Sequence, residues 1–418
     1  MHKICIVGLG YVGLPLAVEL SKHYSVTGVD VNTERIDELK NSFDRTLEIN
    51  DSELQSALKS GNLNFTSSYN DASEANIYIV TVPTPVDVNK TPNLNPLKFS
   101  SKSIGELLCK KDIVIYESTT YPGCTEEFCV PILENASGLK LNKNFFVGYS
   151  PERINPGDKV NTLQTIVKVI SGSNDFATEI IKDVYSKIVN AGLYIAPSIK
   201  VAEASKAIEN AQRDVNISFV NELAIIFELL DIDTSEVLEA AASKWNFLKY
   251  SPGLVGGHCI GVDPYYLSYK SKQLGYEPQV ILSGRKVNNS IPKLIVDKAI
   301  QILVRKKIDL ANAKVAILGL TFKENCPDIR NSMVFEVNNE LEKYDLNIDL
   351  FDPVANPQEV FSEHSVVLKK QFNKDDYSII ILAVPHTEYL KLDIKKSINT
   401  VFIDVKGVFP KELSDYRL

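Results

Sequence analysis

One cysteine stands in a glycine-rich segment whose residue types suit covalent catalysis. The segment runs from Gly256 through His258 and Cys259 to Asp263. Glycines let the backbone approach a substrate closely, the thiol of Cys259 is a candidate nucleophile, and the carboxylate of Asp263 is a candidate to position water or a base. Because most cysteines are buried small hydrophobes, a structural role for Cys259 stays open. The choice depends on what the rest of the chain binds.

The chain begins with a dinucleotide-binding pattern. An apolar run of the kind that forms a buried parallel strand leads into a GxGxxG motif made by Gly8, Gly10 and Gly13. A helical pattern follows the motif, and the next strand ends at the acidic Asp30. In this context the glycines make room for a pyrophosphate on the helix N-terminus. A nucleophilic Cys259 beside a nicotinamide then indicates oxidation of an aldehyde through a thioester.

Polar residues at strand ends refine the choice of cofactor and the place of the site. Asp30 would accept hydrogen bonds from the ribose hydroxyls and repel a 2′-phosphate, which favours NAD over NADP, whereas Arg35 could serve either cofactor. Three later strands are followed by Thr84, Thr119 and Glu152. Ligands bind outside the carboxyl ends of strands in open α/β sheets, so we expect these side chains to face cofactor and substrate. Simple loop capping is the alternative for any one of them.

A helical pattern without glycine or proline begins at Ile199 and continues to about Leu230. Lys206, Asn210 and Arg213 occur at positions that share one face of this helix. Their surroundings are otherwise apolar, and a lysine in such a setting can shuttle protons, although a solvated polar face is the alternative. A helix of this kind often links two domains and carries a subunit contact, so we expect a homodimer through it.

The last third of the chain looks like a diverged copy of the first. Lys314–Leu320 resembles the first strand, and Leu350–Asp352 resembles the acidic end of the second. The glycine motif is missing there, so this region is not expected to bind a dinucleotide in the same way. The turns of this region that suit a phosphorylated ligand carry Phe322, Lys323, Arg330 and Lys406.

These patterns predict an α/β protein with two doubly wound Rossmann-like domains joined by a long central helix. We expect an N-terminal NAD-binding domain at residues 1–197 and a central helical domain with the cysteine loop at residues 198–298. A C-terminal Rossmann-like domain is expected at residues 299–418. A chain of 418 residues is long enough for this number of domains.

Composition excludes several classes of function. The chain is 44% hydrophobic and 23% charged, with a net charge of -8, so nucleic acid and anionic membrane surfaces are not expected partners. No apolar run reaches the roughly 18 residues that span a bilayer, and the N-terminus enters a strand directly, without a signal peptide. The six cysteines show no CxxC pair and no metal spacing. We therefore expect reduced thiols, a cytoplasmic location and no metal.

From end to end the chain resembles the nucleotide-sugar 6-dehydrogenases, the family of UDP-glucose and UDP-N-acetylhexosamine or mannosamine dehydrogenases. The resemblance lies in five ordered motifs. They are GLGYVGLPLA near the N-terminus, EST at Glu117 to Thr119, SPER at Ser150 to Arg153, GGHCIGVDP at Gly256 to Pro264, and GLTFKENCPDIRNS at Gly319 to Ser332. Membership implies a four-electron oxidation of a sugar C6 hydroxyl to the uronate, with two NAD per turnover and no metal.

The resemblance also implies residue roles. The catalytic set is Cys259 as nucleophile, Lys206 as general acid and base with Asn210 beside it, and Asp263, Thr119 and Glu152 to order the hydrolytic water. The contacts to NAD come from the glycines of the motif, Tyr11, Val12, Asp30, Arg35, Thr84, Thr119 and Arg330. The nucleotide-sugar site is lined by Arg153, Ile154, Lys206, Asn210, Arg213, Gly256, Phe322, Lys323 and Lys406.

Two details resemble the N-acetylated branch of the family. Pro156 replaces the second carboxylate that the glucose enzymes carry, and the cysteine follows Gly-Gly-His. Other motifs look like those of enzymes that make UDP-N-acetylgalactosaminuronic acid for bacterial surface polysaccharides of the Vi-antigen, O-antigen and capsule kind. The expected substrate is thus UDP-GlcNAc or UDP-GalNAc, which differ only at C4. UDP-N-acetylmannosamine and UDP-glucose are the alternatives.

Two readings from other classes remain. A two-electron dehydrogenase of a small hydroxy acid would use Lys206 as base, would not need Cys259, and would form one NADH per turnover. A non-catalytic NAD-sensing module would have no use for Cys259, Lys206 and Asp263 together.

Overall fold

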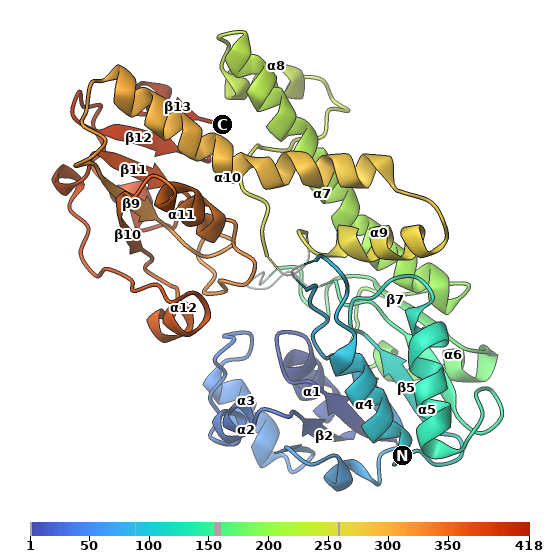
Figure 1. Ribbon diagram of the computed structural model, residues 1–418. Coiled ribbons are helices and arrows are strands. Elements are labelled where there is room, and N and C mark those ends of the chain that lie inside the picture. Colours follow the sequence, from blue (N-terminus) through green and yellow to red (C-terminus); the bar gives the residue numbers. More distant parts are fainter. Residues whose placement is uncertain (1, 88, 154–159, 258–259) are drawn as a thin grey trace. The chain divides into compact units, whose positions relative to one another are not determined.

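A computed structural model describes residues 2–87, 89–153, 160–257 and 260–418 (Figure 1). The chain forms two compact units. Unit 1 comprises Met1–Glu209 and Tyr265–Tyr276, and unit 2 comprises Asn210–Pro264 and Glu277–Leu418. Helices α7 (Ile199–Leu229) and α9 (Asp263–Gln273) belong partly to each unit.

Unit 1 is built on an eight-stranded sheet in the order β3-β2-β1-β4-β5-β6-β7-β8. Its strands are β1 (Lys3–Val7), β2 (Ser25–Val29), β3 (Leu63–Thr66), β4 (Ile77–Val80), β5 (Ile113–Tyr116), β6 (Phe146–Tyr149), β7 (Lys168–Gly172) and β8 (Leu193–Ile195). Neighbouring strands are parallel except β6 and β7, which are antiparallel. The central strands β4 and β5 are buried at every position, which explains why they read as unbroken apolar runs.

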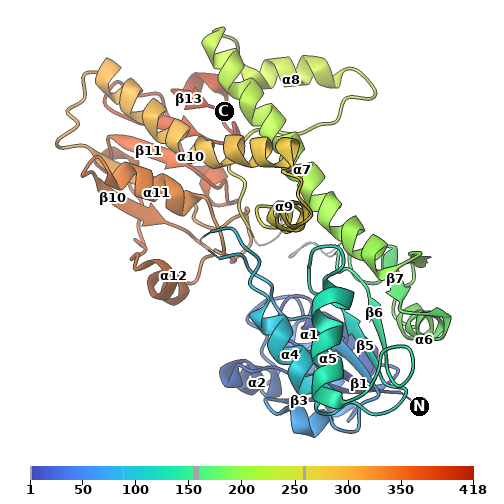
Figure 2. The same cartoon turned by 45° about the vertical axis from the view of Figure 1, so that its right-hand side comes forward.

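Helices cover both faces of this sheet. They are α1 (Gly13–Ser21), α2 (Thr33–Lys40), α3 (Asp51–Lys59), α4 (Asn95–Gly105), α5 (Val130–Ser137) and α6 (Asp175–Ser186). Helices α4 and α5 lie side by side in both views (Figure 2). Three of the helices begin where an asparagine side chain accepts a hydrogen bond from an N–H of the first turn: Asn32 before α2, Asn50 before α3 and Asn174 before α6.

Unit 2 contains a parallel five-stranded sheet in the order β10-β9-β11-β12-β13. Its strands are β9 (Lys314–Leu318), β10 (Asn347–Phe351), β11 (Ile379–Leu382), β12 (Val401–Asp404) and β13 (Tyr416–Arg417). Its helices are α8 (Thr234–Ala242), α10 (Gln279–Arg305), α11 (Val334–Glu342) and α12 (Pro357–His364). Apolar side chains of α10, α11 and the sheet form one buried core, which includes Ile295, Val337 and Ile381.

The predicted fold class is confirmed: two doubly wound α/β domains lie on either side of a long helix in the sequence. The helix expected from Ile199 to about Leu230 spans Ile199–Leu229. Within the described residues, none of the helices combines the length and the apolar character that a bilayer crossing requires.

Candidate active site

The turn between β1 and α1 has room for a ligand where the sequence predicts a pyrophosphate. Gly8 adopts φ +94°, and a Cβ on it would stand 3.0 Å from the carbonyl oxygen of Thr81. A Cβ on Gly13 would stand 1.8 Å from the carbonyl oxygen of Gly8. At Gly10, in contrast, no atom of the described residues beyond its two chain neighbours lies within 4 Å of the Cβ position. Two glycines thus close the turn and the third leaves space beside the N-terminus of α1, which fits a dinucleotide phosphate.

Asp30, directly after β2, and Arg35, on α2, both contact this turn. The Asp30 carboxylate accepts hydrogen bonds from the backbone N–H of Leu9 (2.8 Å) and of Asn32 (2.9 Å). Arg35 is buried, and it donates through Nε to the Leu9 carbonyl (3.0 Å) and through Nη2 to Asp44 (2.7 Å). Its Nη1 has no hydrogen-bond partner, although the carboxylate of Glu38 lies 3.6 Å away. Asp30 remains half-exposed beside the turn, as a reader of ribose hydroxyls would be.

We expect Asp30→Ala combined with Val31→Arg to shift cofactor preference from NAD toward NADP. The double change removes the charge that repels a 2′-phosphate and adds one that attracts it, and the Val31 side chain is 67% exposed, so an arginine fits there. The measurement is the ratio of kcat/KM for the two cofactors. An unchanged ratio would show that Asp30 does not lie at the ribose.

The loops after β4 and β5 are bonded to each other in unit 1. Thr84 Oγ1 donates to the carbonyl of Thr119 (2.7 Å), and the hydroxyl of Tyr266 donates to the carbonyl of Thr84 (2.6 Å). The structure therefore brings together two residues that the sequence predicts at the cofactor. Their backbones fix each other, so a change at Thr84 will also move the loop that carries Thr119.

A buried carboxylate on α7 holds the continuation of the same loop. Glu203 accepts hydrogen bonds from the backbone N–H of Gly123 and of Thr125 (2.8 Å) and from the hydroxyl of Thr120 (3.4 Å). Burial raises the pKa of Glu203 to about 7. Sequence analysis missed this residue, because nothing in the helical pattern marks a glutamate whose partners lie some 80 positions earlier.

Glu152 lies in a buried ionic cluster. Lys168, the first residue of β7, places its ammonium group 3.0 Å from the carboxylate of Glu152 and 3.0 Å from that of Glu117. Arg153, next to Glu152, makes a two-point ion pair with Glu209 on α7, with Nη2 at 2.7 Å and Nε at 3.2 Å. Of the residues that the SPER motif predicts at the site, Glu152 is thus buried and Arg153 is partly exposed. Ile154 lies outside the described residues.

The predicted catalytic residues of α7 differ in their surroundings. Lys206 and Asn210 are buried, whereas Arg213 is exposed. In unit 2 the side-chain amide of Asn210 donates to the carboxylate of Asp263 at 2.5 Å, where α9 begins. The structure thus joins two residues that lie 53 positions apart and that the sequence assigns to the same chemistry.

The described part of the cysteine loop packs against the segment after β9. A Cβ on Gly256 would stand 2.6 Å from the carbonyl of Asn331, and a Cβ on Gly257, where φ is +86°, would meet the ring of Phe322 at 2.8 Å. A Cβ on Gly253 would stand 2.9 Å from Nζ of Lys406. Phe322, a predicted substrate residue, therefore lies against Gly257, the residue that follows the predicted Gly256. His258 and Cys259 lie outside the described residues.

Lys323 and Arg330 belong to the same segment of unit 2. The guanidinium of Arg330 faces the carboxylate of Asp328 in a two-point contact, with Nε 2.9 Å from Oδ1. The carbonyl of Lys323 accepts from the hydroxyl of Thr321 (2.8 Å). Hydrogen bonds within the segment thus hold the backbone of Lys323 and of Arg330 in place.

The turn after β9 in the second domain makes the same backbone-to-carboxylate hydrogen bond as the turn after β1, but a histidine side chain lies against its carboxylate. Gly319 has φ +88°, and the N–H of Leu320 bonds the carboxylate of Asp352 (2.6 Å), as Leu9 bonds Asp30. Here, however, the buried ring of His386 lies against Asp352, with Nε2 at 3.0 Å. Its Nδ1 accepts the N–H of Asn325 (2.9 Å), so Nε2 carries the proton and donates to the carboxylate. The imidazole thus bonds the carboxylate that corresponds in sequence to Asp30.

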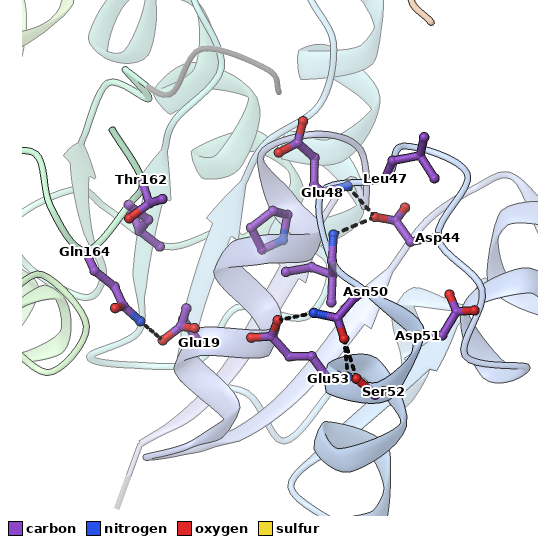
Figure 3. Close-up of a pocket in the computed structure, with 13 residues that line it drawn as sticks. Glu19, Asp44, Leu47, Glu48, Asn50, Asp51, Ser52, Glu53, Thr162 and Gln164 are labelled. Carbon is purple, nitrogen blue, oxygen red and sulfur yellow. Dashed lines mark hydrogen bonds between the residues drawn. The ribbon is translucent and has the colours of Figure 1, made fainter. Parts of the chain in front are cut away.

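A pocket of about 910 Å³ in unit 1 has a different character (Figure 3). It lies between α1, the segment from Asp44 to Glu53, and residues 162–164. Its polar lining is mainly acidic, and several of these groups already have partners: Gln164 donates to Glu19 (2.8 Å) and Asn50 to Glu53 (3.4 Å). An acidic lining disfavours phosphates. None of the described predicted site residues lines this pocket.

Comparisons with known proteins cover the whole chain. Family models of the UDP-glucose/GDP-mannose dehydrogenase family match residues 2–189 as the NAD binding domain, 200–290 as the central domain and 316–411 as the UDP binding domain. The chain is 52% identical to a UDP-N-acetyl-D-glucosamine 6-dehydrogenase of Salmonella typhi, covering 100% of this chain and 98% of that protein. It is 48% identical to a protein of the same name from Pseudomonas aeruginosa, covering 100% and 99%.

A solved structure is also similar. The UDP-D-ManNAc dehydrogenase of Pyrococcus horikoshii superposes with a TM-score of 0.89 at 27% sequence identity, covering 98% of this chain and 96% of that one.

Proposed function

Because the chain belongs to the UDP-glucose/GDP-mannose dehydrogenase family, we propose that it oxidises the C6 hydroxyl of a UDP-N-acetylhexosamine to the uronic acid. It is an NAD-dependent nucleotide-sugar dehydrogenase, and the proposal concerns the sugar and the mechanism. The observation that carries it is the identity of 52% and 48%, over the full length, to two enzymes named for UDP-N-acetyl-D-glucosamine. The mannosamine enzyme of known structure is less similar, at 27%.

The proposed domains follow the chain. The NAD-binding domain comprises residues 1–197, the central domain 198–298 and the UDP-sugar-binding domain 299–418. The three family matches fall within these ranges, which supports the division.

The proposed chemistry divides between a base, a nucleophile and a water site. NAD held at the turn after β1 and beside Asp30 would supply the hydride acceptor for the two oxidations, so that one turnover would consume two NAD molecules. Lys206 takes the proton from the C6 hydroxyl during the first oxidation. The thiolate of Cys259 then adds to the aldehyde carbon, and protonated Lys206 and the Asn210 amide stabilise the negative charge on oxygen. After the second oxidation a thioester joins the sugar to Cys259.

Water must then hydrolyse the thioester, and three residues are proposed to hold it. Asp263 and Glu152 accept hydrogen bonds from the water, and the hydroxyl of Thr119 orients it. The contact between Asn210 and Asp263 supports this assignment, because it fixes an oxyanion donor and a water acceptor to each other at 2.5 Å. Covalent capture by Cys259 explains why the aldehyde need not leave the enzyme.

The binding roles are proposals of the same kind. For NAD they fall on Gly8, Gly10, Tyr11, Val12, Gly13, Asp30, Arg35, Thr84, Thr119 and Arg330. For the nucleotide sugar they fall on Arg153, Ile154, Lys206, Asn210, Arg213, Gly256, Phe322, Lys323 and Lys406. The open space at Gly10 and the anchored carboxylate of Asp30 support the first set. The packing of Phe322 against Gly257 supports the second.

A substrate panel tests the proposed function. We expect UDP-GlcNAc or UDP-GalNAc to give the highest kcat/KM, with UDP-glucose lower by roughly tenfold to a few hundredfold. A site that expects an acetamido group loses apolar contact and a hydrogen bond when that group is absent, worth about 1–3 kcal/mol. The measurement is NADH formation with UDP-GlcNAc, UDP-GalNAc, UDP-N-acetylmannosamine and UDP-glucose. Equal or better turnover of UDP-glucose would assign the chain to the other branch.

The yield of NADH separates the remaining alternatives. The proposed mechanism gives two NADH for each UDP-sugar consumed, a two-electron dehydrogenase gives one, and a sensing module gives none. The first ratio alone agrees with the thioester route through Cys259.

We infer a homodimer formed through α7. Exposed apolar side chains at Val201, Ile208, Phe219 and Ile226 recur at spacings close to whole helical turns and form one stripe. A second copy can cover this stripe with the same face of its own helix. We expect Phe219→Glu to convert a two-chain particle into a single chain in size-exclusion chromatography with light scattering. Val304→Glu, at an exposed apolar position of α10, is the matched control, and a single-chain wild type would contradict the inference.

We place the enzyme in the cytoplasm and in the biosynthesis of surface polysaccharides. Of the described cysteines, Cys5, Cys109, Cys124 and Cys129 are free thiols, which supports a reducing compartment. A uronic acid made on UDP is an activated building block, and this supports a role in polymer synthesis.

A further inference from the structure

A lysine is buried between two carboxylates in unit 1, where three strands of the sheet meet. Lys168 begins β7, Glu117 directly follows β5, and Glu152 lies just beyond β6. The Lys168 side chain is 3% exposed, and its ammonium group stands 3.0 Å from Oε2 of each carboxylate. Burying charge in this way is costly and by itself weak evidence of a stabilising role. A use for the cluster must therefore be sought in what it does to Glu152.

Both oxygens of the Glu152 carboxylate are held. Oε2 accepts from Lys168, and Oε1 accepts from the backbone N–H of Arg153 at 2.6 Å. Two contacts on opposite oxygens fix the plane of the carboxylate.

Lys168 is in turn held on its other side. Its ammonium group bonds Oε2 of Glu117, and the hydroxyl of Tyr185 on α6 donates to Oε1 of the same carboxylate. The ring of Tyr185 lies under the ammonium group, 5.2 Å from it, in a cation–π contact. Lys168 thus contacts Glu117 and Tyr185, which also contact each other, and it bonds Glu152 as a third partner.

The three charged groups shift one another's pKa values. Burial raises the pKa of Glu117, and the charge of Glu152 adds to that rise while Lys168 opposes it. For Lys168, burial alone would lower the pKa, but Glu117 and Glu152 outweigh burial and raise it. Lys168 is therefore the positively charged partner of both carboxylates.

We propose that Lys168 is a positioning residue for Glu152, which orients that carboxylate and keeps it in the ionised form that can hold water. Glu117 and Tyr185 keep Lys168 in place. The catalytic use of this arrangement rests on the proposed function, in which Glu152 helps to hold the hydrolytic water. The arrangement itself does not depend on activity and is tested separately.

The first test reads the charge state of Glu152 without any substrate. In protein labelled with ¹³Cδ-glutamate, the Glu152 signal is the one lost in Glu152→Gln, and its midpoint is followed by pH titration. Lys168→Met should raise the midpoint by roughly 1–3 pH units, because the cation is lost and the second carboxylate remains. Glu117→Gln should lower it, because the competing carboxylate is removed. Midpoints that agree within error in all these proteins would overturn the proposal.

Additional variants guard against loss of folding. Lys168→Met removes the cation between two buried carboxylates and can fail to fold, whereas the pair Glu117→Gln with Lys168→Met keeps the net charge of the cluster at the wild-type value. The pair should still raise the Glu152 midpoint. Lys168→Arg should restore it, because a guanidinium can bond both carboxylates. Lys182→Met, at an exposed ion pair with Glu179 on α6, is the matched control and should leave the midpoint unchanged.

The second test separates hydrolysis from oxidation. In rapid mixing with the best UDP-sugar, Lys168→Met should form its first NADH at the wild-type rate and then turn over at least tenfold more slowly. The slow phase should speed up as pH rises through the new midpoint. An equal loss in both phases would mark a structural role only and overturn the proposal. If wild type oxidises no UDP-sugar, the proposed function fails, and the order of the Glu152 midpoints still decides the role of Lys168.

Discussion

Cys259→Ser is expected to lower steady-state NADH formation by roughly a thousandfold, on the order of 4 kcal/mol of transition-state stabilisation. A serine hydroxyl forms its anion far less readily than a thiol, so the aldehyde made in the first oxidation is captured poorly. Any ester that does form is a poorer acyl donor than a thioester, and hydrolysis stalls. The variant should therefore still reduce an initial NAD and then stop. Stopped-flow absorbance at the NADH band shows both phases.

A second cysteine provides the control for this experiment. Cys109 is exposed in the loop before β5 and is a free thiol, so Cys109→Ser should keep both phases at wild-type rates. Steady turnover of Cys259→Ser within about tenfold of wild type, about 1.4 kcal/mol, would contradict the covalent mechanism.

Asp44→Ala is expected to lower the free energy of unfolding at neutral pH by about 3–5 kcal/mol. The Asp44 side chain is fully buried, and its removal leaves the guanidinium of Arg35 without its buried counter-ion. The backbone N–H groups of Glu48 and Ile49 also lose their acceptor, at 3.0 Å each. Denaturant unfolding followed by circular dichroism measures the loss. Asp51→Ala, an exposed position drawn in Figure 3, should cost about 1 kcal/mol or less.

The effect of Asp44 should depend on pH in one direction. Burial raises the pKa of Asp44, but the N–H of Ile49, the hydroxyl of Thr46 and the Arg35 side chain outweigh it and hold the pKa below its ordinary value. A carboxylate with a lowered pKa stabilises the folded state above its unfolded pKa of about 3.9, and this contribution is lost as pH falls through the folded pKa. Wild type and Asp44→Ala should thus converge in stability in acid. A difference that stays constant down to pH 2 would contradict this account.

The elements that the sequence predicts well are those whose pattern is local. Buried parallel strands such as β4 are apolar runs in the sequence, and the glycines of the first turn indicate that other backbone atoms lie close to it. In unit 1 the strands β3, β7 and β8 were not predicted. β7 begins with the lysine of the ionic cluster, and two of the three residues of β8 are exposed. Strand β7 takes its place by pairing with β6, and β8 by pairing with β7, and no local pattern encodes these pairings.

The candidate site divides in the same way. Motifs predict which residues bear chemistry, and their roles stay predictions. What motifs do not contain is the set of partners that hold those residues: Lys168 behind Glu152, Glu203 on the loop beyond Thr119, and Asp44 behind Arg35. Each of these is a charged residue whose burial is possible only because a partner folds against it. From composition and spacing alone, a charged residue is predicted to be exposed to solvent.

The contact between His386 and Asp352 in the turn after β9 limits how easily the second domain could acquire a dinucleotide site. Thr321 and Glu324 stand where the first motif has Gly10 and Gly13, so two substitutions to glycine would recreate the GxGxxG sequence. The imidazole of His386 would still cover Asp352, and removing it would leave the N–H of Asn325 without its acceptor. A dinucleotide site in this domain would therefore require the loss of His386 and a new hydrogen-bond acceptor for Asn325 in addition to the two glycines.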